Sequence, residues 1–152
     1  MSERFSDRAQ KVMAYANVEC HRLGNEQLGT EHLLLGLVRE GKSTGAAILK
    51  ALNIDLAAVA LEMERTTPKG TPAQTSKRPQ ASDTKTVLDA AVKEADALGD
   101  ASIGTEHLLL ALVVVPDCTA CQKLKEMGVT AETVKREIMR RRQAEGGVGR
   151  RD

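Results

Sequence analysis

Aromatic residues are almost absent from this chain of 152 residues, which has one Phe, one Tyr and no Trp. Strands favour aromatic and β-branched side chains, whereas Ala and Leu, present here 20 and 17 times, favour helices. The composition therefore argues against an all-β fold. It also argues against a surface for single-stranded nucleic acid, because such surfaces stack bases on aromatic rings.

Long apolar runs, a secretory signal and a disulfide framework are lacking as well. No apolar stretch approaches the ~18 residues that cross a bilayer, and the charged residues 1–4 are not followed by an apolar run. Three cysteines in a chain of this length do not make a disulfide framework. We therefore expect a cytoplasmic protein with no membrane partner.

Charge is balanced overall, with a net charge of +1, but it is distributed unevenly. Residues 135–152 carry seven basic and three acidic side chains. Such an end can contact nucleic acid or acidic partners. We favour a solvated helix end followed by a flexible basic tail over residues 144–152, and expect no nucleic-acid partner.

An internal repeat is the most informative feature of the sequence. The segment RLGNEQLGTEHLLLGLV at 22–38 returns as ALGDASIGTEHLLLALV at 97–113, an offset of 75 residues. Aligned without gaps from Phe5 to Arg65, the two copies share 20 identities over 61 pairs. This indicates the duplication of one unit, and such units normally pack about a pseudo-twofold axis.

Each copy is predicted to form four helices, because apolar residues recur at three- and four-residue steps. Ser6 or Asp7 is expected to cap the first helix, and Asp55 is expected to cap the fourth. Thr30 is expected to cap the second helix, with Glu31 in its first turn. Asn53 stands at the position of Gly128, where a left-handed turn is expected. The fold class predicted is all-α, with two tandem four-helix repeats. The expected divisions are a double domain over 1–145, made of repeat one at 5–65, a Pro-rich linker at 66–80 and repeat two at 81–143.

Three segments carry a family resemblance: RFSDRAQKVMAYA at 4–16, LGTEHLLLGLVREG at 28–41 and IGTEHLLLALV at 103–113. Together they resemble the N-terminal domain of the Clp ATPase chaperones, closest to the ClpC type, over about residues 3–140. The resemblance implies a domain that receives protein substrates and adaptor proteins. In that family the domain serves a hexameric ATP-driven unfoldase, which passes substrates to the ClpP peptidase, and ClpC-type domains also bind phosphorylated arginine.

A chain of 152 residues is too short to hold an ATPase module beside this domain. The resemblance therefore implies a non-catalytic recognition domain of a Clp unfoldase and protease system. The alternative is a standalone regulator, which would compete for adaptors or dock on the Clp complex as an accessory protein.

Residues 36–43, GLVREGKS, match the phosphate-loop pattern GxxxxGK[ST]. That loop needs a strand before it and a helix after it, so that its amides can surround phosphates. Here a helix is predicted before it, and the second copy has Ala111, Pro116 and Asp117 in place of Gly36, Gly41 and Lys42. We interpret the match as a helix end followed by a turn, and expect no enzyme.

The cysteines and histidines are interpreted as structural. Cys118 and Cys121 form a CxxC pair, but neither a second pair nor a thioredoxin-like context accompanies it. Cys121 corresponds to Ala46 and is expected to be a small core residue. His32 and His107 lie just inside the second helices and are expected to bond to a helix-start group. We expect no metal and no cofactor.

The candidate ligand-binding residues come from the resemblance, which pairs the Gly-Thr-Glu of one repeat with the first-helix start of the other. They are Phe5, Ser6, Thr105 and Glu106 for one pocket, and Thr30 and Glu31, with the segment around Ala81, for the other. A helix start offers amides and a hydroxyl to a phosphate, while a carboxylate pairs with a guanidinium.

The second copy departs from the family pattern at its start. Ala81 lacks the usual hydroxyl, and Asp83 adds a negative charge where Arg is usual. That charge disfavours a phosphate, so we expect the pocket with Glu106 to bind phosphoarginine better than the pocket with Glu31. The core of the repeat does not require Phe5, because Gln80 stands at its position in the second copy. The resemblance places Phe5 at the rim of the Glu106 pocket.

Overall fold

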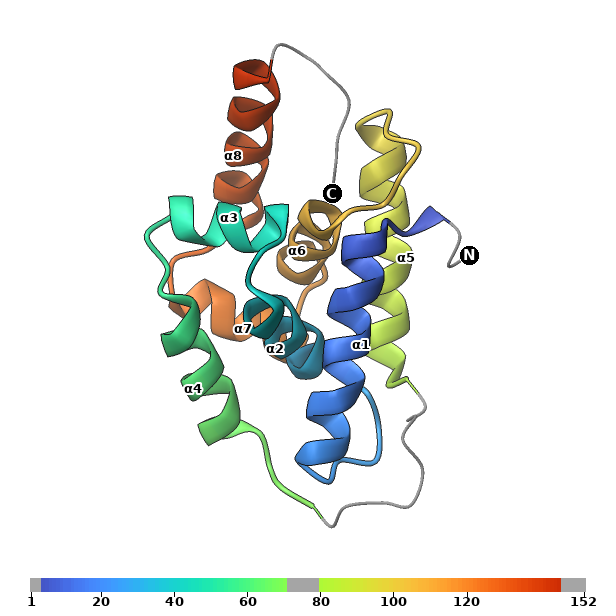
Figure 1. Ribbon diagram of the computed structural model, residues 1–152, viewed down its shortest axis with the longest axis vertical. Helices are drawn as coiled ribbons and strands as arrows, with labels where there is room; N and C mark the ends of the chain where they lie inside the picture. Colours follow the sequence, from blue (N-terminus) through green and yellow to red (C-terminus); the bar gives the residue numbers. More distant parts are fainter. Residues whose placement is uncertain (1–3, 71–79, 146–152) are drawn as a thin grey trace.

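The computed structural model describes residues 4–70 and 80–145, and its helices there follow the predicted order (Figure 1). Repeat one contains α1 (Asp7–Arg22), α2 (Thr30–Glu40), α3 (Thr44–Ala51) and α4 (Leu56–Thr66). Repeat two contains α5 (Ser82–Ala97), α6 (Thr105–Val114), α7 (Thr119–Glu126) and α8 (Ala131–Ala144). The predicted all-α pair of four-helix repeats is thereby confirmed.

The core lies around α2 and α6, which occupy the middle of the molecule (Figure 1). Leu34, Leu35, Leu109 and Leu110 from these two helices are fully buried. The repeats pack together through their second and third helices, since α2 contacts α6 and α7 while α3 contacts α6 and α8. The apolar Leu-Leu-Leu run of each copy thus belongs to the centre of the core, as its composition indicates.

Gly36 explains how closely α1 and α2 approach each other. A Cβ at this position would lie 2.5 Å from the backbone oxygen of Val12 and 2.9 Å from the backbone nitrogen of Ala16. Only a residue without a side chain fits such a backbone contact. This glycine therefore serves helix packing in the structure.

The helix starts are capped largely as the sequence predicts. The side chains of Ser6 and Asp55 accept hydrogen bonds from the backbone of their own first turns, and Asn53 adopts the left-handed conformation predicted for it. The expectation that Thr30 caps α2 is wrong. Gly29 is the cap residue and Thr30 is the first helical residue, because the backbone is already helical there.

The two repeats exchange backbone contacts at their starts. Phe5 forms a bridge with Ile103, and Gln80 forms the equivalent bridge with Leu28. Ser6 N donates to the carbonyl of Ile103 at 2.9 Å. Each first-helix start thus lies beside the Gly-Thr-Glu segment of the other repeat, related by the pseudo-twofold axis.

The predicted linker begins later than residue 66. Thr66 ends α4, Thr67 is buried, and Gly70 N donates to the carbonyl of Leu23 at 2.8 Å, so the chain stays against repeat one to residue 70. The rest of the predicted linker (71–79) and most of the predicted flexible tail (146–152) lie outside the described residues. In the parts described, no helix is long and apolar enough to span a bilayer, and only the bent pairs α3–α4 and α6–α7 meet that test together.

Candidate ligand-recognition site at the helix starts

His32 and His107 hold the turns that precede α2 and α6. His32 Nδ1 accepts a hydrogen bond from Gly29 N at 2.8 Å, and its Nε2 donates to Asn25 Oδ1 at 2.7 Å. Because Nδ1 accepts, the imidazole is neutral, and burial lowers the pKa of His32 to about 4. His107 Nδ1 accepts from Gly104 N at 2.8 Å in the same way. The predicted structural role of both histidines is confirmed.

The two threonines of the Gly-Thr-Glu segments cap helices of the opposite repeat. Thr105 Oγ1 accepts a hydrogen bond from Gly45 N, at the start of α3, at 2.7 Å. Thr30 Oγ1 accepts from Ala120 N, at the start of α7, at 3.2 Å. Both threonines are fully buried. These reciprocal caps join the repeats, and both hydroxyl groups are engaged inside the protein.

Glu106 follows Thr105 and faces a cation of α8. Its carboxylate is 1% exposed, and its Oε2 lies 3.5 Å from Nη2 of Arg142. Arg142 also donates to Asp100, with 2.6 Å between Nη2 and Oδ2. Arg141 and Arg142 line a small cavity together with Glu106. The surroundings of the Glu106 carboxylate are therefore cationic.

Asp100 connects this cation to the histidine of the same turn. Its Oδ2 lies 2.8 Å from His107 Nε2. Burial by itself would raise the pKa of Asp100, but the hydrogen bonds from Arg142 and His107 outweigh it and lower the pKa. The aspartate is thus an anion held between two donors.

Glu31, the counterpart of Glu106, lies in different surroundings. Burial raises its pKa, and the negative charge of Asp83 adds to the increase. At the repeat offset, Asp83 corresponds to Arg8 and Thr67 corresponds to Arg142. The cation that faces Glu106 is therefore a neutral residue in the other repeat, and an aspartate stands there at the position of Arg8.

Phe5 and Ser6 lie beside the segment that leads into Thr105. Ser6 caps α1, since its hydroxyl accepts from Ala9 N at 3.0 Å. Phe5 is 5% exposed and belongs to the core, where it faces Gln80 and Leu88 at a shallow pocket. The structure thus buries Phe5 in the core, although the second copy has the polar Gln80 at its position.

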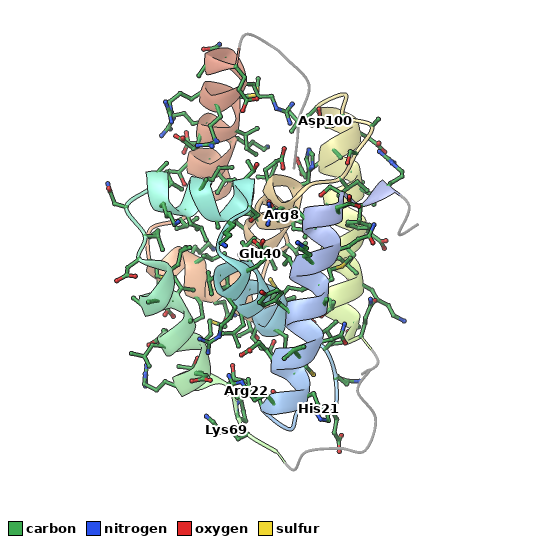
Figure 2. The ribbon with its side chains drawn as sticks, in the orientation of Figure 1. Arg8, His21, Arg22, Glu40, Lys69 and Asp100 are labelled. Carbon is green, nitrogen blue, oxygen red and sulfur yellow. The ribbon has the colours of Figure 1, made fainter. Side chains whose placement is uncertain are left out.

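Arg8 forms an ion pair between α1 and α2 that the sequence did not indicate. Its Nη1 lies 2.6 Å from Oε2 of Glu40, a carboxylate that is almost fully buried. Figure 2 labels both residues of this pair, which joins the start of α1 to the end of α2. The second copy has Asp83 and Val115 at these positions, and this difference is the signal that could have pointed to Arg8.

The segment with the phosphate-loop pattern has the predicted geometry of a helix end and a turn. Gly36 to Glu40 complete α2, and Ser43 caps α3 by accepting from Ala46 N at 3.2 Å. The loop amides therefore belong to helix ends. A phosphate loop would need a strand at the place where α2 stands.

The CxxC pair also has a structural role. Cys118 Sγ accepts from Cys121 N at 3.3 Å and so caps α7, while burial raises the pKa of the Cys118 thiol. Cys121 is buried, as predicted for a core residue. Across residues 4–70 and 80–145, no group of three or more His, Cys, Asp or Glu side chains is arranged to hold a metal ion.

Two four-helix repeats that cap each other's helices define a duplicated all-α domain with cavities at its helix starts. The family described as the Clp repeat (R) N-terminal domain matches residues 4–126 and 82–147. The chain belongs to this family.

Relatives and solved structures agree with the family. The negative regulator of genetic competence ClpC/MecB of Bacillus subtilis is 37% identical over 141 residues, covering 91% of this chain and 17% of the relative. The chain thus spans about a sixth of the length of such relatives. The ClpD N-terminal domain of Arabidopsis thaliana has a TM-score of 0.72 at 25% identity, covering 93% of this chain and 99% of that one.

One of the solved structures with a similar fold is a complex with a peptide. The complex of a ClpV N-domain with a VipB peptide contains a chain with a TM-score of 0.73 and 16% identity to this one. The match covers 90% of this chain and 85% of that chain. At this identity the likeness concerns the fold.

Proposed function

We propose that this chain is a non-catalytic recognition domain of a ClpC-type unfoldase and protease system of the cytoplasm. It binds protein substrates and adaptors, which the associated ATPase and ClpP then process. Family membership supports this proposal, as does the similarity of its fold to a ClpV N-domain that takes a peptide. The alternative is a standalone regulator that competes for the same adaptors or docks on the Clp complex.

The finer proposal is that phosphoarginine-tagged proteins bind at Glu106. A phosphoarginine side chain carries a guanidinium and a phosphate close together, so its pocket needs a carboxylate beside cations or helix amides. Glu106 supplies the carboxylate and lies 3.5 Å from Arg142. The cationic surroundings of Glu106, compared with the anionic surroundings of Glu31, are the observation that carries this proposal.

The contacts of Arg142 suggest the order in which the two groups of the ligand bind. Its guanidinium already pairs with Glu106, so an incoming ligand guanidinium takes over this carboxylate. Asp100 holds Arg142 by a second contact of 2.6 Å, which keeps the displaced cation near the ligand. The phosphate then meets Arg142, in the charge-assisted pairing that arginine forms with phosphate. Ser6, Phe5 and Thr105 shape the neighbouring helix starts.

The Glu31 pocket is proposed to bind more weakly. Asp83 and Glu31 would both repel a phosphate, and Thr67 offers no positive charge where Arg142 stands in the other repeat. We therefore assign the main site to Glu106 and a weak site to Glu31.

Calorimetry with free phosphoarginine tests this assignment, with free arginine as the ligand control. Glu106→Gln should weaken binding about tenfold, because a charge-assisted hydrogen bond contributes roughly 1.5–3 kcal/mol. Glu31→Gln should change the affinity less than twofold, because the weak Glu31 site contributes little to the measured binding. Equal affinities for the wild type and both variants, with thermal unfolding curves that show intact folds, would overturn the phosphoarginine proposal.

Gel filtration and pull-downs test the broader role. A recognition domain should retain adaptor proteins by itself and leave the ClpC–ClpP complex unbound, whereas an accessory regulator should co-elute with that complex. ATP should leave the melting temperature of the chain unchanged, since a ligand that binds the native state raises it. A rise with ATP would instead indicate a nucleotide binder.

A further inference from the structure

An apolar groove opens on repeat two between α5, α6 and α8. Leu110 and Ile138 form its buried floor, while Leu98, Ala97 and Met139 line its sides. Its volume is about 210 Å³. Small-molecule sites usually enclose roughly 300–1,000 Å³, so this groove is the right size for apolar side chains of a protein segment.

Four charged side chains stand at the equivalent place in repeat one. Arg22 Nη2 lies 2.6 Å from Oε1 of Glu19, and Arg39 Nη2 lies 3.2 Å from Oε2 of Glu64. Arg22 also pairs with Glu64, and Arg39 with Glu19, so the four form a closed network across α1, α2 and α4. Long charged side chains cover apolar surface with their methylene groups, and we infer that this network covers Leu35 and Met63, the counterparts of the floor residues.

Repeat two keeps only one of these four charges. At the offset of 75, the counterparts of Glu19, Arg22, Arg39 and Glu64 are Glu94, Ala97, Val114 and Met139. Met139 is 47% exposed although it is a large apolar residue. The floor residues keep their apolar character in both copies, so we attribute the open groove to the loss of the network.

Charge at the groove indicates which segment fits it. Glu94 lines it from α5 and Lys135 lines it from α8, so a negative and a positive group lie on opposite sides of an apolar floor. An amphipathic helix places apolar residues on one stripe with charged residues beside it, and it binds such grooves through residues at helical spacing. Met139 at the side of the groove has a flexible side chain, which can adapt to the shape of a bound segment.

We propose that this groove is a docking site for an amphipathic helical segment of a partner protein. The segment inserts one or two apolar side chains over Leu110 and Ile138, directs a basic residue to Glu94 and directs an acidic residue to Lys135. The proposal rests on the recognition role proposed above. It adds a second surface, on repeat two alone, that needs no phosphorylated residue.

Substitutions that move the charged network from repeat one into repeat two test whether the groove binds a peptide. Ala97→Arg, Val114→Arg and Met139→Glu together rebuild in repeat two the network that folds in repeat one. The probe is a fluorescein-labelled amphipathic peptide of Leu, Ala, Lys and Glu with Leu at helical spacing, and a scrambled peptide of the same composition is the control. Fluorescence anisotropy should show binding to the wild type that weakens at least about tenfold in the closed variant.

The reverse exchange provides a matched gain of binding. Arg22→Ala, Arg39→Val and Glu64→Met should open an equivalent groove in repeat one and add a second peptide site. If the closed triple variant does not fold, the single change Met139→Lys at the exposed edge replaces it and should also weaken peptide binding.

Three outcomes would overturn the groove proposal. One is equal peptide affinity in the wild type and the closed variant, and another is equal binding of the scrambled peptide. The third is a wild-type dimer, seen by light scattering, that the closed variant loses, because the occupant would then be a second copy of the chain. Phosphoarginine binding is measured on the same variants, and its retention separates failure of the groove from failure of the Glu106 site.

Discussion

Arg142 joins two acidic residues that belong to different parts of repeat two. Its Nη2 lies 2.6 Å from Asp100 Oδ2 and 3.5 Å from Glu106 Oε2. Asp100 stands before α6 and Glu106 in its first turn, whereas Arg142 comes from the end of α8. Figure 2 shows Asp100 at the end of the molecule opposite to Arg22, one of the two arginines of the repeat-one network. These arginine ion pairs of the two repeats thus lie at opposite ends of the molecule.

Replacing Arg142 tests whether this cation stabilises the fold. Arg142→Met should lower the free energy of unfolding by roughly 2–3 kcal/mol, because it leaves the buried Glu106 carboxylate without its cation. Arg136→Met is the matched control, since Arg136 is exposed and its partner Glu132 is 3.8 Å away, and it should cost less than about 0.5 kcal/mol. Urea unfolding measures both, and equal losses would contradict the assignment.

The reciprocal caps make a second prediction. Thr105→Val removes the acceptor of Gly45 N but keeps the side-chain volume, so it should cost about 1–2 kcal/mol of unfolding free energy. Thr105→Ser keeps the hydroxyl and should cost less. Thr86→Val, on the exposed surface of α5, is the control and should change stability by less than about 0.5 kcal/mol. Unfolding curves in which the Val and Ser variants at position 105 coincide would argue against the cap.

The buried His32 predicts a pH dependence of stability. Its pKa of about 4 in the folded chain lies below the ordinary value of 6.5, because burial disfavours the charged ring. Between these two values the unfolded chain binds more protons than the folded one, so stability is complete above pH 6.5 and falls as the pH drops toward 4. The loss attributable to His32 should be about 3 kcal/mol.

Unfolding free energies between pH 7 and pH 4 measure this effect. His32→Gln should show a shallower decline than the wild type, since Gln can still accept from Gly29 N and does not titrate. His21→Gln is the control, because His21 lies at the end of α1 and is only half-buried, and it should keep the wild-type slope. Parallel curves for the His32 variant and the wild type would show that another group causes the decline.

Much of the fold could be predicted from the sequence because its signals are local. Apolar periodicity, the caps Ser6 and Asp55, and the left-handed Asn53 each depend on a few neighbouring residues, and the structure has them as expected. The structural roles of His32 and Cys121 were predictable for the same reason. The bonding of His32 to Gly29 spans three residues, and Cys121 could be compared with Ala46 across the repeat.

The candidate site was only partly predictable. The sequence indicated the Gly-Thr-Glu segments, but it could not show that Arg142, more than thirty residues away, would lie against Glu106. The comparison with Gln80 showed only that the core of the repeat does not require Phe5, and it could not show that the ring is buried.

The sequence by itself determined the duplication, the helices and the family, because all three follow from patterns repeated along the chain. Only the tertiary structure decided what the shared residues do. Thr30 and Thr105 carry hydroxyls that could cap their own helices, yet each accepts from the opposite repeat. A side-chain hydroxyl bonds to whichever donor the packing brings within reach, and that donor is chosen by how two repeats meet in space.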